Sequence, residues 1–233
     1  MNKLRDKIRD ASSSRASGLG FGATRSKKTA TLLLLVHGER SSLAAITDAD
    51  AYLVPSAADR PTGDKEAVSG LILGKNGASP ADGFDFLVID ETTPAAALLN
   101  EDVGYLMRAT PDIPDSFLRA LQSLPLDGLI VTASGDITVR EQVEMARLAG
   151  FTGKPLFVEV APDVASKQLE VLREAGAVGL IADAARGAEA IAGLRRTISA
   201  LPPRRKRVRE ERDAVSVAMP AASSEDEADF DDD

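Results

Sequence analysis

The polar residues that end a series of short apolar runs are the side chains best placed to do chemistry. The runs "TLLLLVHG", "GFDFLVIDE" and "PLFVEV" bring His37, Asp90 and Glu159 to such positions. Imidazole and carboxylate groups are the usual proton carriers of general acid–base catalysis. Over eight such runs the candidates are His37, Lys75, Asp90, Arg108, Thr132, Ser134, Glu159 and Asp183.

Glu159 and Arg108 are the two candidates that a solvated strand end explains least well. Glu159 lies inside "LFVEVA" and Arg108 inside "YLMRAT", each with apolar residues on both sides. A charge in such surroundings costs several kcal/mol unless it is paired or hydrogen-bonded. Two interpretations stay open: an ion pair that merely fills the interior, or a general base beside an anion-binding group.

The other candidates divide into proton carriers and binding groups. His37 is the only histidine, so it is the predicted proton donor, although a hydrogen-bonded strand end would also account for it. Asp90 is a second candidate base. We predict that Arg108 contacts the substrate together with Lys75, Thr132, Ser134 and Asp183. Asp183 would equally serve as a helix cap. No compact motif such as HExxH is present, so no metal site is predicted, and no cofactor is indicated.

The elements that carry these residues alternate between strand and helix patterns. Each apolar run is about four residues long, which suits a strand buried on both faces. Helical spacing separates the runs at 41–49, 93–102, 138–151, 163–177 and 187–201, whereas 55–68 and 76–83 have room for little more than a turn. Eight such units predict a small (β/α)8 barrel. The alternative is an open doubly wound sheet, but "VHGERSS" lacks its glycine-rich first turn.

The phrases "LREAGAVGLIAD" and "GKPLFVEVAPD" resemble compact TIM-barrel proteins in general, over residues of about 30 to 201. The resemblance implies that the carboxyl ends of all strands meet at one mouth, where such enzymes build their active sites. The candidate residues would then lie together. A resemblance to so widespread a fold implies no particular activity.

Charge separates the ends of the chain from its middle. The net charge is −8, of which the last 11 residues contribute seven acidic groups, leaving −8 + 7 = −1 for the rest. A basic cluster, "PPRRKRVRE", precedes that acidic end. We therefore predict a flexible leader over 1–28, the barrel over 29–201, and a disordered basic-then-acidic tail over 202–233.

Composition narrows the functional classes. The near-neutral middle argues against a nucleic-acid binder, and no apolar run approaches the length of a membrane helix. Without cysteines or an export signal, the predicted location is the cytoplasm. The predicted activity is that of a lyase or isomerase acting on a small anionic carbon compound. The alternative is a non-catalytic barrel whose charged tails, the acidic one above all, bind a protein partner.

Overall fold

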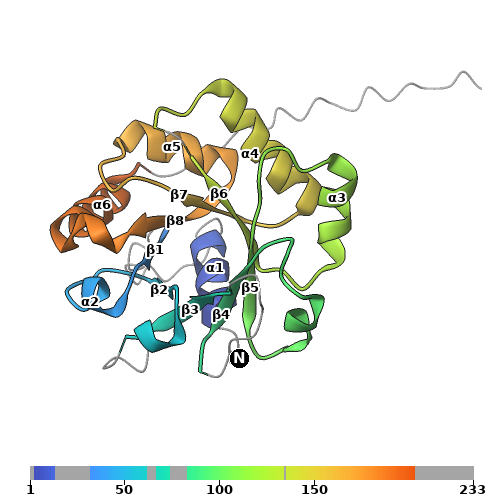
Figure 1. Ribbon diagram of the computed structural model, residues 1–233. Coiled ribbons are helices and arrows are strands. Elements are labelled where there is room, and N and C mark those ends of the chain that lie inside the picture. The colour runs from blue at the N-terminus through green and yellow to red at the C-terminus, as the bar shows by residue number, and fades with distance from the viewer. Residues whose placement is uncertain (1–2, 14–31, 62–66, 74–82, 134, 203–233) are drawn as a thin grey trace, which may run out of the picture. The chain divides into compact units, whose positions relative to one another are not determined.

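Eight parallel strands close into a barrel in the computed structural model of the chain (Figure 1). The structure describes residues 3–13, 32–61, 67–73, 83–133 and 135–202. Neighbours in sequence pair with each other, and the last strand pairs with the first. The strands are β1 Leu33–His37, β2 Ala51–Val54, β3 Val68–Ile72, β4 Phe86–Ile89, β5 Gly104–Arg108, β6 Gly128–Thr132, β7 Leu156–Glu159 and β8 Ala177–Asp183. The predicted barrel is confirmed, and the open sheet is excluded.

The connecting helices are longer in the second half of the barrel. The α-helices are α1 Lys3–Ser13, α2 Arg40–Leu43, α3 Asp115–Ala120, α4 Val139–Thr152, α5 Ser166–Ala175 and α6 Ala188–Ala200. Four 3₁₀ turns are η1 Ala57–Asp59, η2 Ala95–Leu99, η3 Leu121–Ser123 and η4 Ala184–Arg186. The helices predicted at 41–49 and 93–102 are thus reduced to α2 and η2, and α3 had no counterpart among the predicted segments. Within the described ranges, no helix is long and apolar enough to span a membrane.

Local signals in the sequence set the ends of the longer helices. Thr138 begins α4 with a capping box: its hydroxyl accepts the Glu141 N–H at 3.2 Å, and its own N–H donates to the Glu141 carboxylate at 2.8 Å. Gly153, at φ 64°, ends α4, and Gly176, at φ 111°, ends α5. Glycine adopts this left-handed conformation without the steric cost that other residues incur.

Two phenylalanines fill the barrel interior against glycines on neighbouring strands. Phe86 of β4 and Phe157 of β7 are fully buried in the interior cluster. A Cβ built on Gly70 would lie 2.2 Å from the Phe86 ring. On the other side, a Cβ on Gly128 or Gly179 would lie 2.8 or 2.5 Å from the Phe157 ring. The glycines therefore supply the space that the aromatic rings occupy.

Three aspartates join the beginnings of neighbouring strands. Asp50, Asp85 and Asp127 are the residues immediately before β2, β4 and β6. The backbone N–H of each donates to a carbonyl on the preceding strand, at 2.8 Å in all three cases. The residue that supplies this carbonyl also donates its own N–H to the aspartate carboxylate. These residues are Leu34 at 2.8 Å, Ser69 at 2.9 Å and Tyr105 at 3.1 Å. These two-way contacts hold the register at the amino end of the barrel.

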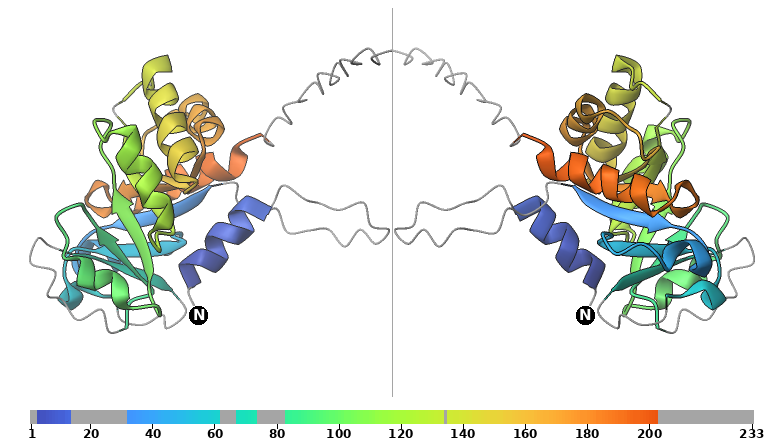
Figure 2. Two further views of the ribbon diagram at one scale, coloured as in Figure 1. Left: turned by 90° about the vertical axis from the view of Figure 1, so that its right-hand side faces the viewer. Right: turned by 90° about the vertical axis from the view of Figure 1, so that its left-hand side faces the viewer.

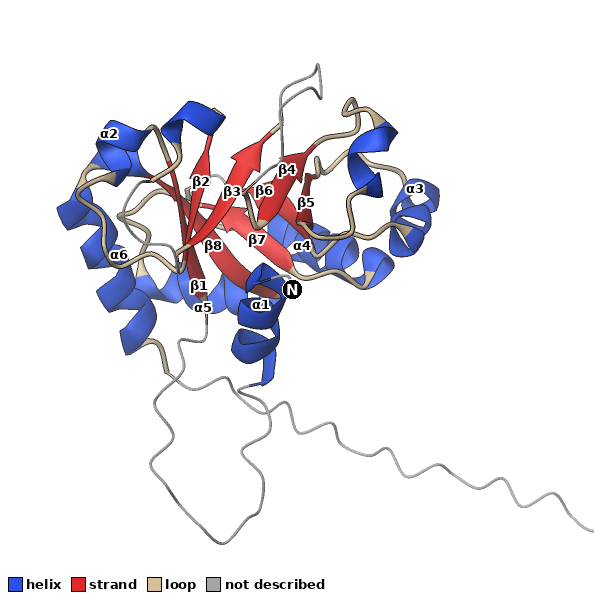
Figure 3. Ribbon diagram, turned by 90° about the horizontal axis from the view of Figure 1, so that it is seen from below, coloured by secondary structure: helices blue, strands red, loops and turns tan. Residues whose placement is uncertain are grey.

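Helix α1 lies across that same amino end of the barrel (Figures 1 and 3). Leu4 is fully buried in the interior cluster, and Ile8 and Ala11 pack against it. Lys3 pairs with Asp85 at 3.5 Å, and Arg5 pairs with Asp127 at 2.7 Å. The first part of the predicted leader is therefore a helix that covers the barrel. The rest of the leader, and the tail from 203, lie outside the described residues.

Figure 2 shows α1 from two sides, beside one end of the strands. The covering of the amino end is thus made by α1, whereas α5 and α6 pack on the outside of the strands through residues such as Leu172, Ile191 and Leu194. Interior and exterior of the barrel are separate apolar clusters. Helix α1 contributes to the interior cluster, and helices α5 and α6 contribute to the exterior one.

We predict that Gly70→Ala lowers the free energy of unfolding by about 1–3 kcal/mol, because the added methyl overlaps the fully buried Phe86 ring and one of the two must shift. Gly150→Ala, on α4, is the matched control: its Cβ meets nothing within 4 Å, so stability should stay equal or rise. Urea unfolding of both variants measures the difference. Equal stability of the two would contradict the interior packing described above.

We predict that Leu4→Ala costs about 2–5 kcal/mol of stability, since it opens a cavity where the interior cluster is now filled. The matched control is Lys7→Ala on the same helix, which removes no fully buried side chain and should change stability by about 0.5 kcal/mol or less. Thermal and urea unfolding of both proteins test this. A Leu4→Ala protein as stable as the control would show that α1 does not pack on the barrel in solution.

Candidate active site

Six of the predicted residues form a polar ring at the carboxyl end of the barrel. Side chains of a strand alternate between its two faces, so a residue two positions after an interior residue shares the interior face. Leu35, Val88, Leu106, Ile130, Phe157 and Ile181 all belong to the interior cluster. The residues two positions later, hereafter the mouth ring, are His37, Asp90, Arg108, Thr132, Glu159 and Asp183.

Strand register makes neighbours within the mouth ring. His37 of β1 is the register partner of Asp183 of β8, and Thr132 of β6 is the partner of Glu159 of β7. Arg108 of β5 pairs with Ile130, one layer below Thr132. The sequence predicted that the carboxyl ends of the strands would meet at one mouth, and the closed parallel barrel places these six strand ends at the same end of the molecule.

Glu159 is held by side chains from two other strands. Its Oε2 accepts the Thr132 hydroxyl at 2.8 Å, and its Oε1 lies 3.4 Å from Arg108 Nη2. The Arg108 side chain is 47% exposed and the Glu159 side chain 33% exposed. The ion pair considered from the sequence is thus present. It lies at the open end of the barrel in contact with solvent, where a bound molecule could reach both partners.

Asp90 is engaged by the turn that follows β4. Its Oδ1 accepts the Thr92 N–H at 2.8 Å and the Thr92 hydroxyl at 2.6 Å, and the Thr93 hydroxyl lies at 3.3 Å. The hydrogen bond from the Thr92 hydroxyl is the main reason why the pKa of Asp90 is lowered. These contacts stabilise the ionised carboxylate and give Asp90 a local structural role.

Asp183 caps the turn that follows β8. Its Oδ1 accepts the N–H of Ala185 at 2.8 Å, at the start of η4. This is the cap that the sequence offered as one explanation of Asp183. Of the three carboxylates in the mouth ring, Asp90 and Asp183 are thus hydrogen-bonded within their own turns, whereas Glu159 relies on neighbouring strands.

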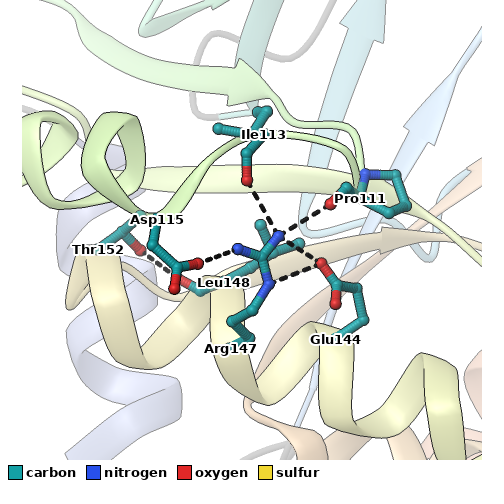
Figure 4. A network of polar contacts seen from close by, with 7 residues as sticks. All are labelled: Pro111, Ile113, Asp115, Glu144, Arg147, Leu148 and Thr152. Carbon is teal, nitrogen blue, oxygen red and sulfur yellow. Dashed lines mark hydrogen bonds and ion pairs between the residues drawn. The ribbon is translucent and has the colours of Figure 1, made fainter.

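Arg147 of α4 ties down the loop that follows Arg108 (Figure 4). The hydrogen bond with Glu144 is the main reason why the pKa of Arg147 is raised. Its guanidinium donates to the Pro111 carbonyl at 2.8 Å, the Ile113 carbonyl at 3.0 Å, Glu144 Oε1 at 2.5 Å and the Asp115 carboxylate. Sequence reasoning missed this residue; the only signal was Glu144 three positions before it on the same helix.

Two predicted binding residues, Lys75 and Ser134, lie outside the described residues. Among the residues that the structure describes, no group of three or more histidine or carboxylate side chains is arranged to hold a metal ion.

Comparison with known proteins finds the fold in several enzymes. The KGPDC of Streptococcus mutans superposes with a TM-score of 0.57 at 9% identity, covering 73% of this chain and 98% of that one. The 3-keto-L-gulonate-6-phosphate decarboxylase of Vibrio cholerae superposes with a TM-score of 0.56 at 13% identity, covering 74% of this chain and 99% of that one. A mutant tryptophan synthase alpha-subunit from Pyrococcus furiosus superposes with a TM-score of 0.54 at 14% identity, covering 72% of this chain and 97% of that one. No protein-family model matches the sequence, and no curated protein matches it. At these identities the likeness concerns the fold.

We predict that Asp90→Ala lowers the melting temperature at neutral pH, and that the difference from wild type shrinks in acid. A carboxylate whose pKa is lowered on folding contributes stability above its unfolded pKa, ordinarily 3.8, and loses it as the pH falls through the folded value. The difference should therefore be constant between about pH 5 and 8 and decline below about pH 4.

Thermal melts of both proteins across that range make the measurement. Thr92→Val, which removes the hydroxyl mainly responsible for the lowered pKa, should reproduce part of the loss with the same pH dependence. A pH-independent difference for Asp90→Ala would show that its ionised carboxylate does not stabilise the turn.

Proposed function

We propose that this protein is a lyase or isomerase that acts on a small anionic carbon compound by general acid–base chemistry at the mouth of the barrel. The observation that carries the proposal is the position of Glu159. Its carboxylate is oriented by the Thr132 hydroxyl and lies beside the Arg108 guanidinium, with both charged side chains partly exposed. A base and a cation so placed can remove a proton from a bound anion and stabilise the charge that develops.

Each side chain has a separate role in this proposal. Glu159 is the general base, and Thr132 positions it by occupying one carboxylate oxygen. Arg108 binds the anionic group of the substrate, or the enolate that forms when the proton leaves. His37, at the end of β1, is the proton donor. Asp90 and Asp183 hold the turns on which the ring depends.

The comparisons support the reaction class at the level of the fold. One neighbour is named as a decarboxylase of a sugar-acid phosphate and another as the alpha-subunit of tryptophan synthase. The chain spans nearly the full length of both. TIM-barrel enzymes build their sites at the carboxyl ends of the strands, where the mouth ring lies. We propose that the enzyme works in the cytoplasm; a chain without cysteine forms no disulfide and so has no need of an oxidising compartment.

The test is a turnover screen with the full chain. Small keto acids, hydroxy acids and sugar acids, with and without phosphate groups, are incubated with the protein, and proton NMR follows their consumption or rearrangement. Glu159→Gln should reduce any turnover by about 10²- to 10⁴-fold, because the amide cannot accept a proton. Glu170→Gln, on α5, is the matched control and should leave turnover unchanged.

Equal turnover by wild type and Glu159→Gln would overturn the assignment of the base. Consumption of no compound in the panel would count against an enzyme of this class. Circular dichroism and thermal melts of each variant establish that a lost activity does not come from a lost fold.

A further inference from the structure

The ion pair in the mouth ring is longer than the two arginine–aspartate pairs at the amino end of the barrel. Arg108 Nη2 and Glu159 Oε1 are 3.4 Å apart. At the amino end, by contrast, Arg5 lies 2.7 Å from Asp127 and Arg195 lies 2.7 Å from Asp50. Charge-assisted hydrogen bonds between nitrogen and oxygen are usually 2.7–2.9 Å long. The Arg108 guanidinium is therefore only loosely engaged by its own protein partner.

We propose that Glu159 occupies a carboxylate-binding site on Arg108, and that a ligand carboxylate replaces it there. The inference rests on the proposed function and names the substrate class: a compound with a monoanionic carboxylate group. A guanidinium offers two parallel donors that match a planar carboxylate. The group now beside Arg108 is itself a carboxylate, so the site already shows the chemistry of the ligand that it accepts.

The exposure of the pair allows such an exchange. With side chains 47% and 33% exposed, both charges are partly solvated. Ion pairs of this kind contribute little, so competition from Glu159 weakens binding of an external anion by no more than about fivefold. A short, buried pair would hold its arginine far more firmly.

The charge of the mouth ring favours a monoanion over a phosphate dianion. The ring contains three carboxylates, Asp90, Glu159 and Asp183, and one guanidinium. Repulsion from this surplus of negative charge rises with the charge of the ligand. Backbone donors that would compensate a phosphate in these barrels come from glycine-rich loops after the seventh and eighth strands. Here those loops, residues 160–165 and 184–187, contain only Gly187.

The exchange links binding to catalysis. When a ligand carboxylate takes Arg108, Glu159 loses its cationic neighbour but keeps the hydrogen bond from Thr132. The Glu159 carboxylate is then still oriented by Thr132, is no longer neutralised by Arg108, and lies next to the bound molecule. Substrate binding thus releases the base that acts on the substrate.

The experiment measures anion binding without requiring turnover. Acetate and inorganic phosphate are titrated separately into the full, ¹⁵N-labelled chain at pH 8 and constant ionic strength. The Arg108 Nε–H signal, identified by its loss in Arg108→Ala, and the Thr132 backbone amide report binding by NMR. Wild type, Glu159→Gln, Arg108→Lys, Arg108→Ala and the control Glu170→Gln are compared.

We expect saturable acetate binding that Glu159→Gln strengthens about two- to fivefold, because the competitor is removed. Arg108→Ala should abolish the response at Thr132, and Arg108→Lys, which keeps the charge but loses the planar pair of donors, should weaken it. Phosphate should bind more weakly than acetate in every protein that binds acetate. Glu170→Gln should match wild type.

Unchanged acetate affinity in Glu159→Gln, binding retained in Arg108→Ala, or tighter binding of phosphate would each overturn the inference. Its failure is distinguishable from that of the proposed function. Competitive acetate binding together with turnover that ignores Glu159→Gln would keep the carboxylate site and reject Glu159 as the base. Turnover that is lost in Glu159→Gln, together with an acetate affinity that this substitution leaves unchanged, would keep Glu159 as the base and reject the carboxylate site.

Discussion

The interior of an eight-stranded barrel must be filled by its own side chains, and the rest of this structure depends on how that is done. Two large rings, Phe86 and Phe157, occupy the interior, and glycines on the adjacent strands make room for them. Leu4 of α1 adds a further apolar side chain to the same cluster. With the interior closed in this way, polar groups on the inward faces are confined to the last residue of each strand or the one after it, which is why the mouth ring forms.

The two ends of the barrel use the same residue types for different purposes. At the amino end, Asp50, Asp85 and Asp127 each accept a backbone N–H from the preceding strand and pair with a cation from a helix. Their oxygens are therefore committed to holding strands and helices in place. At the carboxyl end, Glu159 is bonded only to side chains. A partner on a side chain can be exchanged at a lower structural cost than one on the backbone.

The sequence predicted the barrel, and the polar residues that end its strands, because both depend on local pattern. Short, uniformly apolar runs ending in polar residues specify buried parallel strands, and closure brings their ends together without further information. The contact of Arg147 with the loop after Arg108 joins residues more than 30 positions apart and has no local signature. The packing of α1 on the barrel escaped prediction for a similar reason: Leu4, Ile8 and Ala11 have helical spacing, but only the closed barrel reveals what they cover.

Whether a carboxylate in the mouth ring can act on a ligand follows from where its hydrogen bonds come from. Asp90 and Asp183 accept N–H groups two residues further along the chain, so their contacts are local and would survive any change in the centre of the mouth. Glu159 receives its contacts from β5 and β6, and so it responds to whatever approaches those strands. The sequence already set Glu159 apart, because a solvated strand end explains it less well than it explains Asp90 or Asp183. The direction of their hydrogen bonds separates them, leaving Glu159 as the carboxylate whose surroundings a bound molecule can change.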